Sequence, residues 1–149
     1  MVPEINYWAV LVATASSMLI GAVWYARGVM GERWARLAGV DLEHPSRRPL
    51  WPMITTVLMS FVTAWVLAGA ATIAWHFYEG SYLWASVVTS VTLWAGFTAA
   101  RFITHDAFEG RSTRLTTLNI GHELLTVVVM ALIIGAWPPA ALWQSAQAL

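Results

Sequence analysis

Residues 6–26 read NYWAVLVATASSMLIGAVWYA, an apolar run without a single charged side chain. A helix needs roughly 20 apolar residues to cross the hydrocarbon core of a bilayer, which is about 30 Å thick. The run is too long for a strand and lacks the strict alternation of a barrel strand. It therefore predicts a transmembrane helix, and with it the fold class of the whole chain.

Three further stretches have the same length and character, at about residues 50–75, 82–103 and 116–137. The sequence thus predicts an all-α membrane protein with four transmembrane helices. Most connections between them are short, so neighbouring helices should run antiparallel in an up-down bundle. No repeat or composition change divides the chain, and residues 1–149 are expected to form a single four-helix transmembrane domain.

The composition agrees with this prediction. Hydrophobic residues make up 58% of the chain and charged residues 11%, whereas a soluble domain carries about 25% charged residues. The net charge of zero removes any bulk attraction to nucleic acid, so no nucleic-acid partner is expected. The chain has no Cys, which excludes thiolate chemistry, disulfides and iron–sulfur clusters, and no Lys for a Schiff base. We expect no cofactor.

The basic residues predict the orientation in the membrane. All eight are Arg, and each one flanks or lies within the first or the third predicted loop. The positive-inside rule makes this side cytoplasmic and places both termini outside. Exclusive use of Arg is compatible with a GC-rich bacterial genome, so the expected location is a bacterial inner membrane.

The first loop is the longest and contains VMGERWARLAGV at residues 29–40. At helical spacing this segment places three apolar side chains on one face and Glu32 and Arg36 on the opposite side. It predicts a short helix lying in the cytoplasmic interface, which Gly39 ends. Five basic residues in and around this loop are expected to contact anionic lipid headgroups: Arg27, Arg33, Arg36, Arg47 and Arg48.

Small residues recur at a spacing of four in three of the predicted spans. Such ridges let helix backbones approach closely where lipid supplies no hydrophobic drive. Two interpretations stay open: packing within one bundle, and packing between subunits of a homo-oligomer or of a larger membrane complex. The ridges are Ala13, Ser17 and Gly21; Ser60, Ala64, Ala68 and Thr72; and Ala131 and Gly135.

Polar side chains inside a span are costly and are functional candidates by default. The fourth predicted helix carries Asn119, His122 and Glu123, and the third ends with Arg101, His105 and Asp106. Asn119 and Glu123 are four residues apart and share a face. Glu123 should lie roughly 10 Å from the cytoplasmic end. If the third and fourth helices pack together, Arg101 would lie near Glu123.

Three interpretations of these polar residues remain open. In a structural one, Glu123 pairs with Arg101 or Arg27, and His122 and Asn119 bond to neighbouring helices. In a second, Glu123 and His122 relay protons or ions. In a third, His105, Asp106, His122 and Glu123 offer imidazole and carboxylate ligands to a metal ion, and the same residues could serve a lipid-acting membrane enzyme. Adjacent His and Glu point two ways on a helix and no HExxH motif occurs, so no metal site is predicted.

No catalytic motif is found, so the expected function is that of a non-enzymatic accessory or assembly subunit. A small-solute or ion transporter or channel is the first alternative, and a lipid-acting membrane enzyme is the second. The expected partners are membrane lipids and either further copies of the chain or other membrane subunits.

Residues 21–39, GAVWYARGVMGERWARLAG, resemble the pattern G-x-x-W-Y-S-P-x-x-F-G-x-x-W-x-x-x-x-G of small bacterial membrane proteins catalogued as domain of unknown function 1761. Residues 118–122, LNIGH, look like the Asn-x-Gly-Tyr-His segment of that family but lack its Tyr. In the first motif, Ala26-Arg27 stands where the family has Ser-Pro, and Met30 stands where the family has Phe. The first motif is matched by Gly21, Trp24, Tyr25, Gly31, Trp34 and Gly39.

The resemblance implies a single four-helix domain and supplies no reaction. It directs attention to Trp24, Tyr25, Trp34, Asn119 and His122 as the positions where a shared role would lie.

Overall fold

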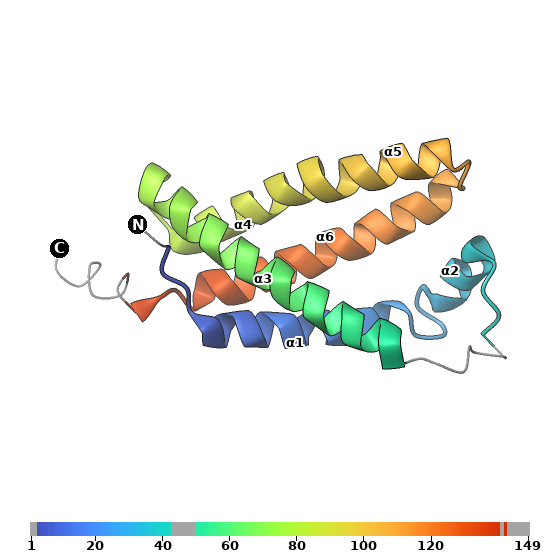
Figure 1. Cartoon of the computed structure of the whole chain (residues 1–149), viewed down its shortest axis with the longest axis horizontal. Coiled ribbons are helices and arrows are strands. Elements are labelled where there is room, and N and C mark those ends of the chain that lie inside the picture. The colour runs from blue at the N-terminus through green and yellow to red at the C-terminus, as the bar shows by residue number, and fades with distance from the viewer. Residues whose placement is uncertain (1–2, 43–49, 141, 143–149) are drawn as a thin grey trace.

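The structure of the chain, a computed structural model, describes residues 3–42, 50–140 and 142. Within these ranges the backbone is helical and contains no strand (Figure 1). Four helical segments are long and apolar enough to cross a membrane, which confirms the predicted all-α fold with four spans. They are α1 (Tyr7–Trp24), α3 (Leu50–Tyr78), the continuous run of α4, η1 and α5 (Tyr82–Phe108), and α6 (Thr113–Ala136).

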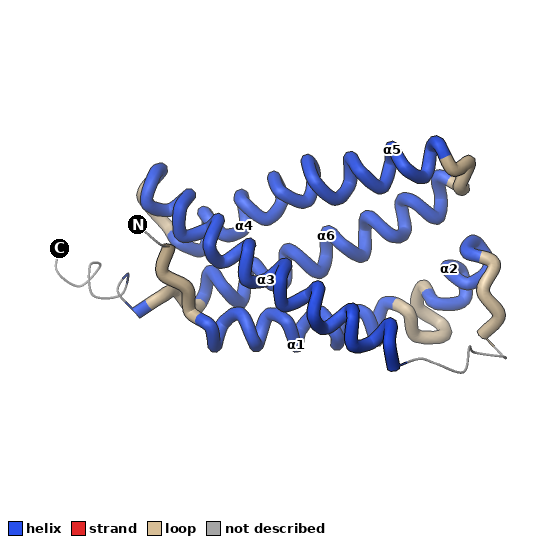
Figure 2. The backbone as a smooth tube through the Cα atoms, in the orientation of Figure 1, coloured by secondary structure: helices blue, strands red, loops and turns tan. Residues whose placement is uncertain are grey.

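The helix ends agree with the signals in the sequence. The Asn6 side chain caps α1 by accepting hydrogen bonds from the backbone N–H groups of Trp8 and Ala9. The predicted interfacial helix is α2 (Gly31–Ala38), and Gly39 ends it with a left-handed φ of 69°, as a C-terminal Gly commonly does. Figure 2 shows α2 within the loop that separates α1 from α3.

The third span is one continuous helix with a change of hydrogen-bond pattern at its centre. It consists of α4 (Tyr82–Leu93), a π-helical turn η1 (Trp94–Ala99) and α5 (Ala100–Phe108). The indole Nε1 of Trp94 donates a hydrogen bond of 3.0 Å to the backbone oxygen of Ile120 in α6. Trp94 therefore packs between helices, whereas Trp65 in α3 is 44% exposed.

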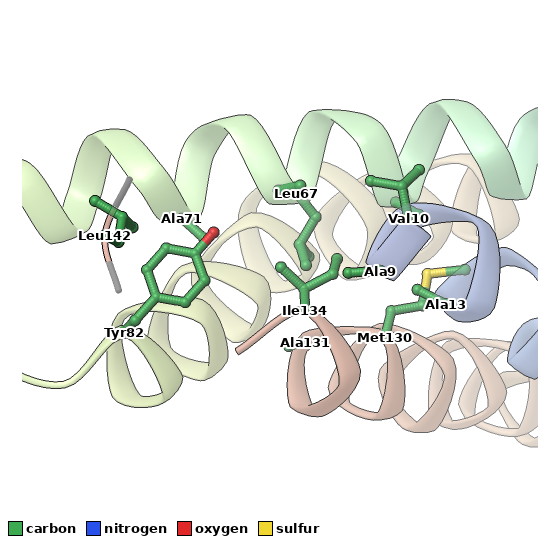
Figure 3. Close-up of a cluster of buried hydrophobic side chains, with 12 residues drawn as sticks. Ala9, Val10, Ala13, Leu67, Ala71, Tyr82, Met130, Ala131, Ile134 and Leu142 are labelled. Atoms are coloured by element: carbon green, nitrogen blue, oxygen red, sulfur yellow. The ribbon is translucent and has the colours of Figure 1, made fainter. Parts of the chain in front are cut away.

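The buried core lies at one end of the bundle, where the described ends of the chain also lie. We call this the terminal end, and the opposite end, with the first and third loops, the arginine-rich end. Small residues on α1, α3 and α6 allow the helices to meet around Leu67, Met130 and Ile134 (Figure 3). The predicted small-residue ridges are used here, since Ala13, Ala64, Ala68 and Ala131 are each at most 2% exposed. Packing within one bundle is therefore confirmed for these ridges.

The arginine-rich end is more open. α3 packs against α1 and α4, whereas α5 packs against α6 rather than against α1 or α3. In Figure 1 the beginning of α3 and the end of α5 diverge from one another. Every residue from Leu50 to Met59 is exposed. The first ten residues of α3 thus present their side chains to the surroundings and not to a core.

Candidate functional site

The chain folds back on itself sharply after α1, and this turn builds the most distinctive site of the molecule. The backbone N–H of Met30 donates to the oxygen of Trp24 (3.1 Å), and that of Gly31 donates to the oxygen of Ala26 (3.3 Å). A Cβ atom at position 31 would collide with the carbonyl oxygen of Tyr25. Only Gly fits there, so the turn explains one Gly of the motif and sends α2 back toward α6.

Four rings from three elements come together at this turn, and we call them the aromatic corner: Trp24, Tyr25, Trp34 and His122. The Tyr25 ring lies 5.3 Å from that of Trp34 in an edge-on arrangement and 5.0 Å from that of His122. The centroids of Trp24 and His122 are 5.8 Å apart. The two segments on which the family resemblance rests are therefore in contact, although they are distant in the sequence.

Two glycines, Gly21 on α1 and Gly121 on α6, lie against the aromatic corner. A Cβ at Gly21 would lie 3.8 Å from Nε2 of His122, and one at Gly121 would lie 3.9 Å from the Trp24 ring. These are ordinary contact distances, so both positions have room for one methyl group.

Three buried nitrogen atoms of the aromatic corner have no hydrogen-bond partner among the described residues. The side chain of His122 is 13% exposed, and its Nδ1 lies 3.5 Å from a carboxylate oxygen of Glu123. Neither ring nitrogen forms a hydrogen bond with the described part of the chain, and the same holds for Nε1 of Trp24. The structural interpretation includes a bond from His122 to a neighbouring helix, but within the described residues the ring packs against the Trp24 and Tyr25 rings without such a bond.

Glu123 influences the same corner electrostatically. Tyr25 follows the last residue of α1; burial raises the pKa of its hydroxyl, and the nearby carboxylate of Glu123 raises it further. The Glu123 side chain is itself 39% exposed. Among the residues that the structure describes, its carboxylate lies beside the His122 imidazole, and neither Arg101 nor Arg27 pairs with it. The predicted structural ion pair is absent there.

The acid at the end of the third span belongs to a separate polar cluster. Asp106 is 6% exposed and accepts a hydrogen bond of 2.6 Å from the hydroxyl of Thr116 in α6. Nε of Arg111 lies 3.8 Å from its other oxygen and 2.6 Å from an oxygen of Glu109. Thr116 was not among the predicted site residues, and its position ten residues after Asp106, across a short turn, was the available signal.

The six predicted cluster residues thus do not form one site. His122 and Glu123 face the end of α1, and Asp106 joins α5 to α6. Arg101 and His105 are exposed, and Asn119 is half-buried with no side-chain hydrogen bond in the described ranges. In those ranges no group of three or more His, Cys, Asp and Glu side chains is placed to hold a metal ion.

The arginines predicted to contact lipid occupy different surroundings. Arg27 donates to the backbone oxygen of Leu42 at 3.3 Å, and it lines a pocket of about 350 Å³ together with Arg36, Glu32 and Asp41. Arg33 lines a different pocket on the other side of α2. Arg47 and Arg48 lie outside the described residues.

A protein-family model described as "Protein of unknown function (DUF1761)" matches residues 8–135. This match includes all four spans except the first residue of α1 and the last residue of α6, and it confirms the resemblance inferred from residues 21–39. No curated protein and no solved structure matches the chain.

Proposed function

Since the chain belongs to the DUF1761 family, whose description assigns no activity, we propose a function from its own geometry: a non-enzymatic accessory or assembly subunit of a bacterial inner membrane that acts as a homodimer. The observation that carries this proposal is a pair of charged residues, Arg101 and Glu123, which lie within spans and do not pair with each other in one chain.

Arg101 and Glu123 lie at similar depths from the arginine-rich end. Arg101 is seven residues before the end of α5, and Glu123 is ten residues after the start of α6. At 1.5 Å per residue, these positions are roughly 10 and 15 Å along their helices. Charged side chains at such depths are costly unless they are paired or hydrated. A second copy of the chain offers the complementary charge for each of them.

The open side of the molecule gives a partner access. α5 does not pack on α3, and the beginning of α3, from Leu50 to Met59, is exposed along its whole length. In a two-fold arrangement, Arg101 of each copy meets Glu123 of the other, so one contact forms twice. The apolar side chains at the beginning of α3 would pack beside these ion pairs. The small-residue ridges do not contribute, because the core of the single bundle already uses them.

Charge exchange tests this proposal. The protein is reconstituted in nanodiscs or mild detergent, and its oligomeric state is measured by light scattering and cross-linking. Arg101→Gln and Glu123→Gln should each weaken dimerisation by a factor on the order of ten or more. The double variant Arg101→Glu with Glu123→Arg should restore it. Arg111→Gln is the matched control, since Arg111 pairs with acids of its own chain.

A strictly monomeric wild-type protein would overturn the proposal. So would a charge exchange that leaves the dimer as weak as the single variants do, since the pairing would then not join the copies. Intrinsic fluorescence of the ten Trp residues identifies any variant that has simply lost its fold.

A second candidate function, transport of protons or small cations, is favoured by one observation. The His122 and Glu123 side chains are 3.5 Å apart within a span, and neither ring nitrogen of His122 forms a hydrogen bond in the described chain. An imidazole beside a partly exposed carboxylate is suited to pass a proton. The lipid-acting enzyme has no such support, because the Asp106 carboxylate is engaged by Thr116 and Arg111.

Flux measurements distinguish the two candidates. Proteoliposomes loaded with a pH-sensitive dye should acidify faster than protein-free vesicles if the chain conducts protons, and Glu123→Gln should abolish the difference. Equal rates for wild type, Glu123→Gln and empty vesicles, repeated for Na⁺ and K⁺ gradients, would exclude transport of these ions.

A further inference from the structure

A second pocket of about 350 Å³ lies where the end of α1, the beginning of α2 and the first turns of α6 meet. We call it the α2–α6 pocket. Its lining combines apolar surface with hydroxyl groups and two guanidinium groups, a mixture that suits an amphiphile. The lining residues are Trp24, Met30, Arg33, Thr113, Arg114, Thr117 and Leu118.

The guanidinium groups of both arginines in the α2–α6 pocket are available to bind a ligand. Neither Arg33 nor Arg114 forms an ion pair or a side-chain hydrogen bond with the part of the chain that the structure describes. Arg111, by contrast, pairs with Glu109 at 2.6 Å. The lining contains no Asp or Glu. Two like charges that share a pocket without an acid favour an anion between them, and guanidinium groups bind phosphate oxygens in pairs.

The neighbouring pocket on the other side of α2 provides an internal comparison. It has the same volume, about 350 Å³, and also contains two arginines, Arg27 and Arg36. Its lining includes the acids Glu32 and Asp41, which offset the positive charge. The α2–α6 pocket therefore has the stronger attraction for an anion, although the two pockets carry equal numbers of Arg.

The backbone adds to the positive potential. Thr113 and Arg114 are the first two residues of α6, a helix of 24 residues whose N-cap Ser112 makes no side-chain capping bond. The first N–H groups of a helix have no partner within it, and they carry a partial positive charge. This partial charge adds to the charge of the two guanidinium groups, which remain the main attraction for an anion.

The location of the pocket indicates the source of the anion. It lies at the arginine-rich end, where α1 ends and α6 begins, so spans adjoin it on one side and the loops on the other. Trp24, Met30 and Leu118 supply a surface for hydrocarbon. We propose that the α2–α6 pocket binds an anionic glycerophospholipid, with the headgroup phosphate held by Arg33 and Arg114 and the upper acyl chain against the apolar lining.

The test measures which lipids the whole protein retains. Native mass spectrometry of the delipidated protein, titrated with phosphatidylglycerol or with phosphatidylcholine of the same chains, should show preferential binding of phosphatidylglycerol. The double variant Arg33→Gln with Arg114→Gln should weaken that binding about thirtyfold, the product of two interfacial arginine contributions. Arg27→Gln with Arg36→Gln removes the same charge from the neighbouring pocket, and binding should change less than threefold.

A second variant tests the cavity without altering charge. Thr117 is exposed and lines the pocket, so Thr117→Trp should fill the space and lower phosphatidylglycerol binding. Thr104→Trp, on the exposed face of α5, should have no effect. The inference is overturned if both lipids bind equally, or if the two double variants behave alike. It is also overturned if Thr117→Trp leaves binding unchanged, or if inorganic phosphate displaces the lipid at equal concentration, which would indicate a site for a soluble anion.

Discussion

Individual residues in this chain are constrained most tightly where a backbone approaches a backbone. Gly31 is the clearest case, because a Cβ there would overlap the carbonyl oxygen of Tyr25 and lie 2.9 Å from that of Ala26. Both obstacles are main-chain atoms, which cannot rotate away as a side chain can. The position also determines where α2 begins, and hence whether Trp34 reaches Tyr25.

Gly31→Ala should therefore destabilise the fold by about 1–3 kcal/mol, the usual cost of inserting a methyl group where no space exists. Thermal or denaturant unfolding in mild detergent, followed by Trp fluorescence, measures this change. Gly69→Ala is the control, because its Cβ would meet only side-chain carbons at 3.7 and 3.8 Å. Equal stability of the Gly31 variant and the wild type would show that the turn is not held as described.

Thr116 is a residue whose importance depends on one hydrogen bond. Its hydroxyl donates to the buried carboxylate of Asp106 at 2.6 Å. Thr116→Val keeps the shape of the side chain but leaves the carboxylate without its donor, at a cost of about 1–3 kcal/mol. Thr104→Val should be close to neutral, because that exposed hydroxyl bonds only to the Ala100 oxygen of its own helix. Comparable unfolding of the two variants would contradict a special role for Thr116.

At the scale of the helix, the spans could be predicted well and their pairing could not. Apolar runs reveal a span because bilayer thickness determines the length that a helix needs. The observed helices differ from the predicted ones mainly at their ends: α6 begins at Thr113 and α3 continues to Tyr78. The first turn of α6 contains Thr113 and Arg114, which carry no apolar signal. The end of α3 lies beyond the polar His76, at which the apolar run of that span is interrupted in the sequence.

The site was predictable in part, for a related reason. Four of the five positions to which the resemblance directs attention, Trp24, Tyr25, Trp34 and His122, lie in ring contact. The fifth, Asn119, is half-buried and does not belong to these contacts. The expected meeting of Arg101 and Glu123 within one chain is not found, because it depends on how α5 and α6 are rotated about their axes. Helical spacing gives the relative positions of residues on one helix, and it does not give the angle at which that helix faces its neighbour.

The contact between α4 and α6 depends on Gly135. A Cβ there would lie 2.8 Å from the Cα atom of Leu83 and 3.2 Å from Cβ of Ser86. Gly135→Ala should force the two helices apart and lower stability by about 1–3 kcal/mol. Gly121→Ala, on the same helix, has 3.9 Å of space and should be tolerated. The stability of both variants is measured by unfolding in the same detergent. A Gly135→Ala variant as stable as the wild type would show that α4 and α6 pack less closely than described.

For the molecule as a whole, the main open prediction is its orientation. The chain has no Cys, so a single introduced Cys is the only thiol that a reagent can label. Tyr78→Cys and Phe108→Cys replace aromatic side chains that are 79% and 92% exposed, at opposite ends of the bundle. With intact cells, a membrane-impermeant maleimide should label position 78 readily and position 108 only after permeabilisation. The reverse pattern would place the arginine-rich end outside.

The same molecule is organised differently at its two ends. At the terminal end a core of buried apolar side chains holds all four spans together. At the arginine-rich end the first ten residues of α3 remain exposed, and the contacts described there join α1, α2, α5 and α6. Stability is therefore expected to reside in one half of the bundle, and binding of partners or lipids in the other.

The π turn at Trp94–Ala99 changes the rotation of α5 relative to α4 within the third span. Ser90 and Asp106, both buried, are sixteen residues apart; in a regular α-helix they would point about 160° away from one another. The additional residue that a π turn accommodates reduces this angle to about 60°. The π turn therefore determines which side chains of α5 face α6. Every side chain from Arg101 to Phe108 could be kept, yet removing one residue from the turn would present a different face of α5 to α6.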